Sequence, residues 1–252
     1  MKIKIDDIEL SYIKKGESDN KILLLHGWGC NKEIFKTITD YLSNFMEVYA
    51  IDFPGFGKTP EPPKVWEVDD YSNLVEKFIK QLGIKKISLL GHSFGGRVII
   101  KLATRTNLPF EIDKIILMDA AGIKHTPPVT KKQKFYKKVF PIIKKISPKL
   151  LNYIKTKVGS VDYRNATPMM RDILVKVINE DLKDLIPNIN RPTLLIWGDK
   201  DTATPYEDAV YMNKNIKDSG IVKIEGAGHF SFLEQPYLVN KVLESFLRGQ
   251  DK

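Results

Sequence analysis

Ser93 stands at the centre of a Gly-x-Ser-x-Gly run, residues 91–95, and this spacing suits a serine that acts as a nucleophile. The apolar residues 87–90 precede the run and the helix-like residues 97–103 follow it, which predicts a strand, a tight turn and a helix. Such a turn strains the serine backbone and exposes its hydroxyl. Glycine is needed at both ends of the run because side chains there would collide across the turn. We take Ser93 as the candidate nucleophile; the alternative is a Gly-Ser turn without chemistry.

A serine hydroxyl needs a general base before it becomes a useful nucleophile. The chain has four histidines. His92 adjoins the serine, so its side chain should point away from it. His26 begins a glycine-rich turn, and His125 opens a lysine-rich stretch. His229 follows the strand-like residues 221–224 in a glycine-rich loop, and such a loop can carry its side chain over a neighbouring site. The sequence favours His229 as the base. The alternative is that His229 is an ordinary surface residue of this loop.

A buried carboxylate usually holds the imidazole of such a base in one tautomer. In hydrolases with this kind of turn, the acid lies between the serine and the histidine in the chain. Residues 193–197 form a continuous apolar run that is typical of a buried parallel strand. Asp199 and Asp201 follow that run, and Asp119 follows the apolar residues 115–118. From the residues alone, all three aspartates are candidate acids.

Acyl transfer builds negative charge on the carbonyl oxygen, and two backbone N–H groups usually stabilise it. The residue after the nucleophile, Phe94, should supply one of them. The other should come from a loop after an earlier strand, and the apolar residues 22–25 followed by the glycine-rich residues 26–29 fit that description. Trp28 is the best candidate for the second donor, and an ordinary strand-ending turn is the alternative.

Five motifs, in this order along the chain, resemble those of the α/β-hydrolase superfamily. They are residues 26–29 (His-Gly-Trp-Gly), 52–57 (Asp-Phe-Pro-Gly-Phe-Gly), 91–96 (Gly-His-Ser-Phe-Gly-Gly), 197–201 (Trp-Gly-Asp-Lys-Asp) and 226–229 (Gly-Ala-Gly-His). The resemblance covers nearly the whole chain and implies that Asp201 is the acid and Asp199 a structural turn residue. It also implies that Asp52 is structural, because that aspartate precedes the serine.

Within this superfamily, a serine at the turn implies acyl transfer, since haloalkane dehalogenases and many epoxide hydrolases carry aspartate there. The substrates would be esters, thioesters, amides, or carbon–carbon bonds next to a ketone. Residues 25–35 also resemble the esterases that cleave the methyl ester of pimeloyl-acyl carrier protein. The leading hypothesis is therefore a cofactor-free serine hydrolase of carboxylic esters. A hydrolase of vinylogous diketones and a non-catalytic binding protein on the same scaffold are the alternatives.

Strand-like apolar runs alternate with helical segments along the chain, at residues 22–25, 48–51, 87–90, 115–118, 193–197 and 221–224. This alternation predicts an α/β fold, a mostly parallel sheet flanked by helices. The candidate catalytic groups all follow strand ends, where ligands bind in such sheets. No glycine-rich phosphate loop or metal-ligand cluster appears, so we expect no cofactor. We expect a core of residues 1–122 and 191–252, with a helical cap of residues 123–190 inserted over the site.

The formal charge of +9 is concentrated in one block, because residues 121–160 contain eleven lysines and no Asp, Glu or Arg. Apolar residues recur between the lysines at near-helical spacing, so we expect short amphipathic helices that Pro141 and Pro148 break or begin. The lysines form either a solvated face or a docking surface for an acidic partner such as an acyl carrier protein. Anionic membrane and nucleic acid are weaker alternatives.

The single cysteine, Cys30, excludes an intrachain disulfide, which fits a reducing compartment. No Gly-x-Cys-x-Gly turn surrounds Cys30, which argues against a nucleophilic role. Residues 1–7 lack the apolar region of a signal peptide, and no apolar run approaches the ~18 residues of a membrane span. We expect a cytoplasmic protein. Phe230 and Phe232 are expected to line an apolar substrate pocket or to pack in the core, and neither the acyl group nor the oligomeric state follows from the sequence.

Overall fold

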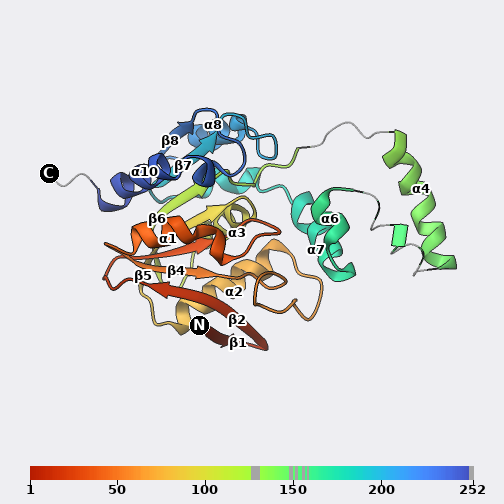
Figure 1. Cartoon of the computed structure of the whole chain (residues 1–252), viewed down its shortest axis with the longest axis horizontal. Coiled ribbons are helices and arrows are strands. Elements are labelled where there is room, and N and C mark those ends of the chain that lie inside the picture. Colours follow the sequence, from red (N-terminus) through yellow and green to blue (C-terminus); the bar gives the residue numbers. More distant parts are fainter. Residues whose placement is uncertain (126–130, 148–149, 151–152, 155–156, 158, 250–252) are drawn as a thin grey trace.

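The computed structural model describes residues 1–125, 131–147, 150, 153–154, 157 and 159–249, and it shows an eight-stranded sheet between two layers of helices (Figure 1). The strands in chain order are β1 (Lys2–Ile5), β2 (Ile8–Lys15), β3 (Lys21–Leu25), β4 (Glu47–Ile51), β5 (Lys86–His92), β6 (Glu111–Met118), β7 (Thr193–Gly198) and β8 (Ser219–Ile224). Their order across the sheet is β1-β2-β4-β3-β5-β6-β7-β8.

The sheet is parallel from β4 to β8, and only β1 and β2 pair antiparallel with their neighbours. The six strands expected from apolar runs are confirmed, and so is the α/β class with a mostly parallel sheet. The two antiparallel strands at the N-terminal edge were not predicted. Their polar and apolar residues alternate, as expected for strands with one solvated face.

Both faces of the central strands are buried, which explains why these strands are continuous apolar runs. In β3, Leu23 and Leu25 pack into one core, while Ile22 and Leu24 pack into the other. The first core lies against α2 (Val68–Gln81), α3 (Phe94–Ala103) and α8 (Tyr206–Asn215). The second lies against α1 (Lys36–Leu42) and α10 (Pro236–Arg248). Two short helices, η1 (Lys32–Phe35) and α9 (Ser231–Glu234), connect these layers to the strand ends.

The chain between β6 and β7 leaves the sheet and contains several helices. They are α4 (Lys131–Ile146), α6 (Val161–Asn165), α7 (Pro168–Asn179) and η2 (Lys183–Asn188). Figure 1 shows α6 and α7 close to the sheet and α4 farther out. The boundaries expected for a cap, residues 123 and 190, stay a prediction.

The expected break at Pro141 is wrong, because α4 continues through this residue. A proline inside a helix removes one hydrogen bond and crowds the preceding turn, and here the helix runs on for five residues beyond it. Pro148 lies outside the described residues. The apolar side chains of Phe135, Ile142 and Ile146 are 60%, 58% and 78% exposed. The amphipathic pattern of α4 therefore predicted its helical structure but not a buried face.

Candidate active site

Ser93 lies in the turn between β5 and α3. Its backbone has a conformation that residues other than glycine rarely adopt (φ 49°, ψ −111°). The backbone N–H of Ser93 donates to the carbonyl of Met118 (3.2 Å), and its own carbonyl accepts from Ala121 (2.9 Å). Strand β6 thereby holds the strained turn in place. A Cβ added to Gly91 would lie 2.6 Å from the backbone of Gly95, so the collision expected from the sequence is confirmed.

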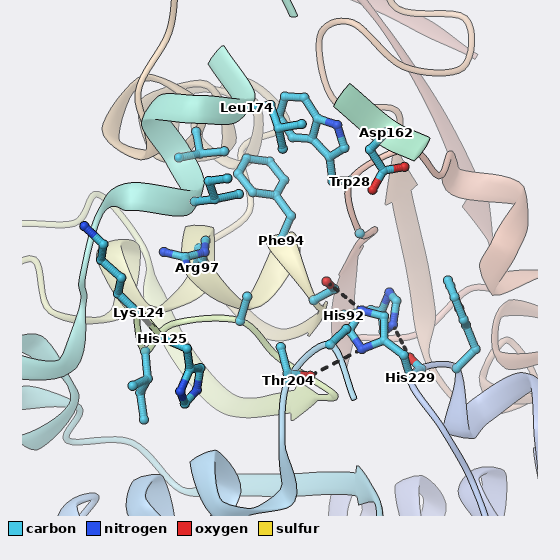
Figure 2. A pocket seen from close by; sticks show the side chains of 18 residues that line it. Trp28, His92, Phe94, Arg97, Lys124, His125, Asp162, Leu174, Thr204 and His229 are labelled. Carbon is cyan, nitrogen blue, oxygen red and sulfur yellow. Dashed lines mark hydrogen bonds between the residues drawn. The ribbon is translucent and has the colours of Figure 1, made fainter. Parts of the chain in front are cut away.

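The side chains of Ser93, His229 and Asp201 form a continuous chain of hydrogen bonds, although they come from three separate loops. Nε2 of His229 lies 2.9 Å from Oγ of Ser93, and Nδ1 lies 2.8 Å from Oδ2 of Asp201 (Figure 2). The carboxylate orients the imidazole so that Nε2 faces the serine hydroxyl. The structure thus brings together the three side chains that the sequence and the family resemblance selected.

The carboxylate of Asp201 accepts several hydrogen bonds besides the one from His229. Its Oδ1 accepts from the backbone N–H groups of Ala203 (2.8 Å) and Thr204 (3.0 Å), and the hydroxyl of Thr204 lies 2.7 Å from Oδ2. Burial by itself raises the pKa of Asp201, but the hydrogen bonds from His229 and Thr204 outweigh burial and lower it. The group facing the imidazole is therefore an ionised carboxylate at neutral pH.

The expected oxyanion donors, Phe94 and Trp28, both border the pocket next to Ser93. Phe94 is the first residue of α3, so its backbone N–H has no acceptor within its own helix. The loop that carries Trp28 approaches the serine closely, since a Cβ added to Gly27 would lie 3.1 Å from Cβ of Ser93. The ring of Trp28 packs edge-on against those of Phe56 and Phe94. This packing fixes the donor loop against the start of α3.

Asp119, the third candidate acid, does not contact His229 but joins the two loops that carry the acid and the base. Its Oδ1 accepts from the backbone N–H of Gly198 (2.9 Å), just before the acid loop. Its Oδ2 accepts from the N–H of Ser231 (3.1 Å) and lies 2.6 Å from the hydroxyl of the same residue, just after the base. Burial raises the pKa of Asp119 to about 7, against the effect of these hydrogen bonds. Asp119 is thus a buried link between the loops.

His92 points away from the serine hydroxyl, as the sequence predicted, and fixes the loop of the base. Its Nε2 donates to the backbone carbonyl of His229 (2.8 Å). Its Nδ1 is buried, and among the described residues it has no hydrogen-bond partner. Burial, followed by the nearby ring of His229, lowers the pKa of His92 to about 3. His92 is therefore a neutral side chain behind the site.

A cavity of about 490 Å³ opens above Ser93 and His229. Residues 123–190, in the insertion after β6, contribute seven residues to its wall, namely Ile123, Lys124, His125, Asp162, Leu174, Val177 and Ile178. Phe230 also lines the cavity, as expected. Phe232 does not belong to the cavity wall, because its ring is buried in the core and packs against Phe35. The two phenylalanines are two positions apart, and the short helix α9 turns the second one inward.

Comparison with known proteins places this geometry in a family. The model of the alpha/beta hydrolase family matches residues 22–242. The chain belongs to the alpha/beta hydrolase family. Pimeloyl-[acyl-carrier protein] methyl ester esterase from Wigglesworthia glossinidia brevipalpis is 26% identical over 92% of this chain and 95% of its own length. Monoacylglycerol lipase ABHD6 from Bos taurus is 24% identical over 97% of this chain and 81% of its own length. The solved enol-lactonase from Burkholderia xenovorans LB400 shares the fold, with 21% identity, a TM-score of 0.79, and coverage of 99% of this chain and all of that one.

The remaining polar residues in the five motifs of this hydrolase hold its loops. Asp52 accepts hydrogen bonds from the backbone N–H groups of Lys32 and Lys58 (both 2.8 Å) and from the ammonium group of Lys32 (2.6 Å). His26 accepts from the backbone N–H of Phe53 (3.0 Å), and burial lowers its pKa to about 4. Asp199 accepts from the N–H of Gly226 (2.7 Å), which joins the acid loop to the loop of the base.

The free thiol of Cys30 is a poor nucleophile, because burial, followed by the nearby Asp162, raises its pKa to about 11. Within the described ranges, the hydrolase has no helix long and apolar enough to cross a membrane. The same part of the chain contains no group of three or more His, Cys, Asp or Glu side chains arranged to hold a metal ion.

Sequence reasoning missed several residues of the site, and two of them are polar side chains close to the serine and histidine. Thr204 contacts Asp201 and lies 3.3 Å from Nδ1 of His229, but a threonine after an acid loop carries no distinctive signal. Arg97 lines the cavity from the fourth position of α3. A signal for Arg97 was present, because it is a charged residue beside the apolar run 98–100, on the helix that follows the nucleophile.

Proposed function

We propose that this hydrolase cleaves carboxylic esters through an acyl-enzyme on Ser93. The observation that carries the proposal is the continuous hydrogen-bonded chain from Ser93 through His229 to Asp201 at the floor of a cavity. A nucleophile, a base and an orienting acid in this geometry suit acyl transfer. The similarity to a methyl ester esterase and to a monoacylglycerol lipase supports the same class of substrate.

The reaction follows from the position of each group. Oγ of Ser93 attacks the ester carbonyl carbon while Nε2 of His229 takes its proton, and the charged imidazole is stabilised by Asp201. The backbone N–H groups of Trp28 and Phe94 hold the resulting oxyanion. The intermediate collapses, and the alcohol leaves with the proton from His229. A water molecule then attacks the acyl-serine, His229 takes its proton, and the acid is released as Oγ regains a proton.

The test compares the wild type with Ser93→Ala, using short p-nitrophenyl esters and a fluorophosphonate label. The variant should lose both turnover and labelling, because it removes the hydroxyl that lies 2.9 Å from Nε2 of His229. Cys30→Ala is the matched control and should be labelled like the wild type, since the thiol is protonated at neutral pH. Ester turnover in Ser93→Ala at the rate of the wild type would overturn the proposal.

The lysine-rich insertion is a candidate docking surface for an acidic carrier protein that presents the acyl group. Lys138 and Lys145 on α4 are exposed, and like-signed charges on one helix steer an oppositely charged partner. Changing both lysines to glutamate should lower kcat/KM on a carrier-bound ester and leave a small free ester unaffected. Equal losses on both substrates would argue against docking at α4.

A further inference from the structure

Arg97 places a guanidinium group in the wall of the cavity, one helical turn beyond the nucleophile. Ser93 is the N-cap residue of α3 and Arg97 is its fourth residue, so the two Cα atoms are separated by about 6 Å along the helix axis. Arg97 as a whole is only 5% exposed. The sole hydrogen bond found for its side chain within the described residues runs from Nη1 to the backbone carbonyl of Glu180 (2.6 Å).

The charge of Arg97 has no carboxylate partner within 4 Å in the part of the chain that the structure describes. The surrounding acidic residues have other hydrogen-bond partners. The carboxylate of Glu180 pairs with Lys101 (2.5 Å), and that of Asp208 lies 2.9 Å from Nε2 of His125. The carboxylate of Asp181 accepts from the backbone N–H groups of Lys124 (3.2 Å) and Lys183 (3.1 Å). Burial lowers the pKa of Arg97. The negative charges of the surrounding carboxylates raise it, but they do not outweigh burial. Burying a charged guanidinium costs free energy when its one partner is a neutral carbonyl. An anion bound in the cavity would offset this cost.

Lys124 lines the cavity on the same side as Arg97, and so does His125, whose ring is hydrogen-bonded to Asp208. Figure 2 shows Arg97, Lys124 and His125 across the cavity from His229, with Asp162 beside Trp28 on the opposite wall. Apolar side chains such as Leu174 and Val177 complete the wall. The cavity therefore combines an apolar lining with one cationic side, which suits a substrate with a short carbon chain and an anionic end.

We propose that the substrate is an ester that carries a carboxylate, and that the guanidinium of Arg97 binds this carboxylate while the ester carbonyl lies at Ser93. The proposal rests on the ester hydrolysis proposed above. Arginine suits this role because its planar group binds a carboxylate through two parallel hydrogen bonds. Hydrolysis adds one water across the ester bond and leaves the bound carboxylate unchanged.

The experiment measures kcat and KM on charged and neutral esters of matched length. Monomethyl esters of the dicarboxylic acids from succinic to suberic carry the carboxylate in the acyl part. Acetate esters of ω-hydroxy acids carry it in the alcohol part. The corresponding dimethyl and methyl-capped esters are the neutral controls. The wild type should prefer one charged series, and the identity of that series shows which side of the ester faces Arg97.

Arg97→Gln removes the charge and keeps a donor for the carbonyl of Glu180. We expect kcat/KM on the preferred charged ester to fall roughly 10- to 100-fold, mainly through KM, with little change on the neutral ester. Arg97→Lys should recover part of the loss. Arg105→Gln is the matched control, because Arg105 lies just beyond the end of α3, pairs with Glu76 (2.7 Å) and is not part of the cavity wall. Its preference should equal that of the wild type.

Equal losses of Arg97→Gln on charged and neutral esters would overturn the proposal and make Arg97 a structural cap of α7. A wild type that cleaves neutral esters without preferring charged ones would overturn it too, while leaving ester hydrolysis intact. If no ester is cleaved, a binding measurement still decides between the two outcomes. Calorimetry should detect a charged ester with Ser93→Ala and much weaker binding with Ser93→Ala/Arg97→Gln, and equal binding by both proteins would refute the role of Arg97.

Discussion

Helices α3 and α4 both carry many apolar residues, and the fold uses them in opposite ways. Nine of the ten residues of α3 are buried, whereas α4 leaves Phe135, Ile142 and Ile146 more than half exposed. Helix α3 follows directly from the central strand β5, which fixes where its first residue lies. Helix α4 is attached to no strand, and Figure 1 shows it outside the two helical layers. An apolar pattern therefore makes a helix, but a neighbouring strand decides what that helix packs against.

The same contrast separates the loops that carry the catalytic groups from the insertion. The acid and base loops are tied to each other by Asp119 and Asp199 and to the strand ends by backbone hydrogen bonds. Chemistry that depends on distances of 2.8 and 2.9 Å needs such fixed positions. If this comparison is right, small changes near the strand ends should have large effects, and changes in α4 should have small ones.

The largest effect is expected for Asp201→Asn, which keeps the shape of the side chain and removes its charge. An amide favours the wrong tautomer of His229 and cannot stabilise the charged ring, so kcat should fall by about 10⁴-fold. Steady-state kinetics on a p-nitrophenyl ester measure the loss. Asp199→Asn is the matched control, because the carboxylate of Asp199 accepts from the backbone N–H of Gly226 instead of facing the imidazole, so its charge should matter far less. A larger loss from the Asp199 variant would show that the acid is wrongly assigned.

Gly27→Ala should have the next largest effect, because the donor loop approaches the nucleophile closely. The added Cβ would lie 2.8 Å from Nδ1 of His92 and 3.1 Å from Cβ of Ser93, so the loop must move. A displacement of about 1 Å costs on the order of 10² in rate, and kcat is the quantity to measure. Gly220→Ala in β8 has open space around its Cβ and serves as the control. Equal activities of the two variants would place the donor loop elsewhere.

A smaller effect, on stability rather than rate, is expected for Asp119. Its folded pKa of about 7 lies above the unfolded value of about 3.9. The group therefore contributes most below pH ~4, and this contribution is lost as the pH rises through 7. Urea denaturation at several pH values measures the free energy of unfolding of the wild type and of Asp119→Asn. Between about pH 4 and 7, this free energy should fall more in the wild type than in the variant. A constant difference would mean that Asp119 titrates alike in both states.

The smallest effect is expected in α4, where Ile146→Gln should change the free energy of unfolding by no more than about 0.5 kcal/mol. Turnover of a small ester should also be unchanged, since Ile146 is 78% exposed. Ile99→Ala, in the buried face of α3, should cost about 2–5 kcal/mol. Denaturant titration of both variants makes the comparison direct. Similar losses in the two helices would mean that α4 packs as tightly as α3.

The sequence predicted the parts of the fold that depend on runs of neighbouring residues, such as apolar strands and glycine-containing turns. The apolar run 193–197 is typical of a strand buried on both faces, and the turn around Ser93 needed its two glycines. The order of serine, aspartate and histidine then limited the choice of acid. Choosing Asp201 over Asp199 required the family resemblance, because both aspartates follow the same strand.

Other features depended on contacts that a sequence does not contain. Phe230 and Phe232 look equivalent in the sequence. Helix α9 begins between them, so Phe230 lines the cavity while Phe232 packs in the core. The edge strands β1 and β2 are short and half polar, so they lack the apolar run of a central strand. The helices of the insertion were predictable from spacing, but their position was not, since no strand end fixes it.

The separation of Ser93 and His229 by 136 positions has a consequence for how the protein folds. Neither the turn nor the loop of the base is complete until β5, β6, β7 and β8 have paired in parallel, and each pairing closes a long stretch of chain. Such non-local pairings form slowly. Recovery of hydrolase activity after dilution from denaturant would therefore follow the closing of the sheet, and it would lag behind the return of helical signal.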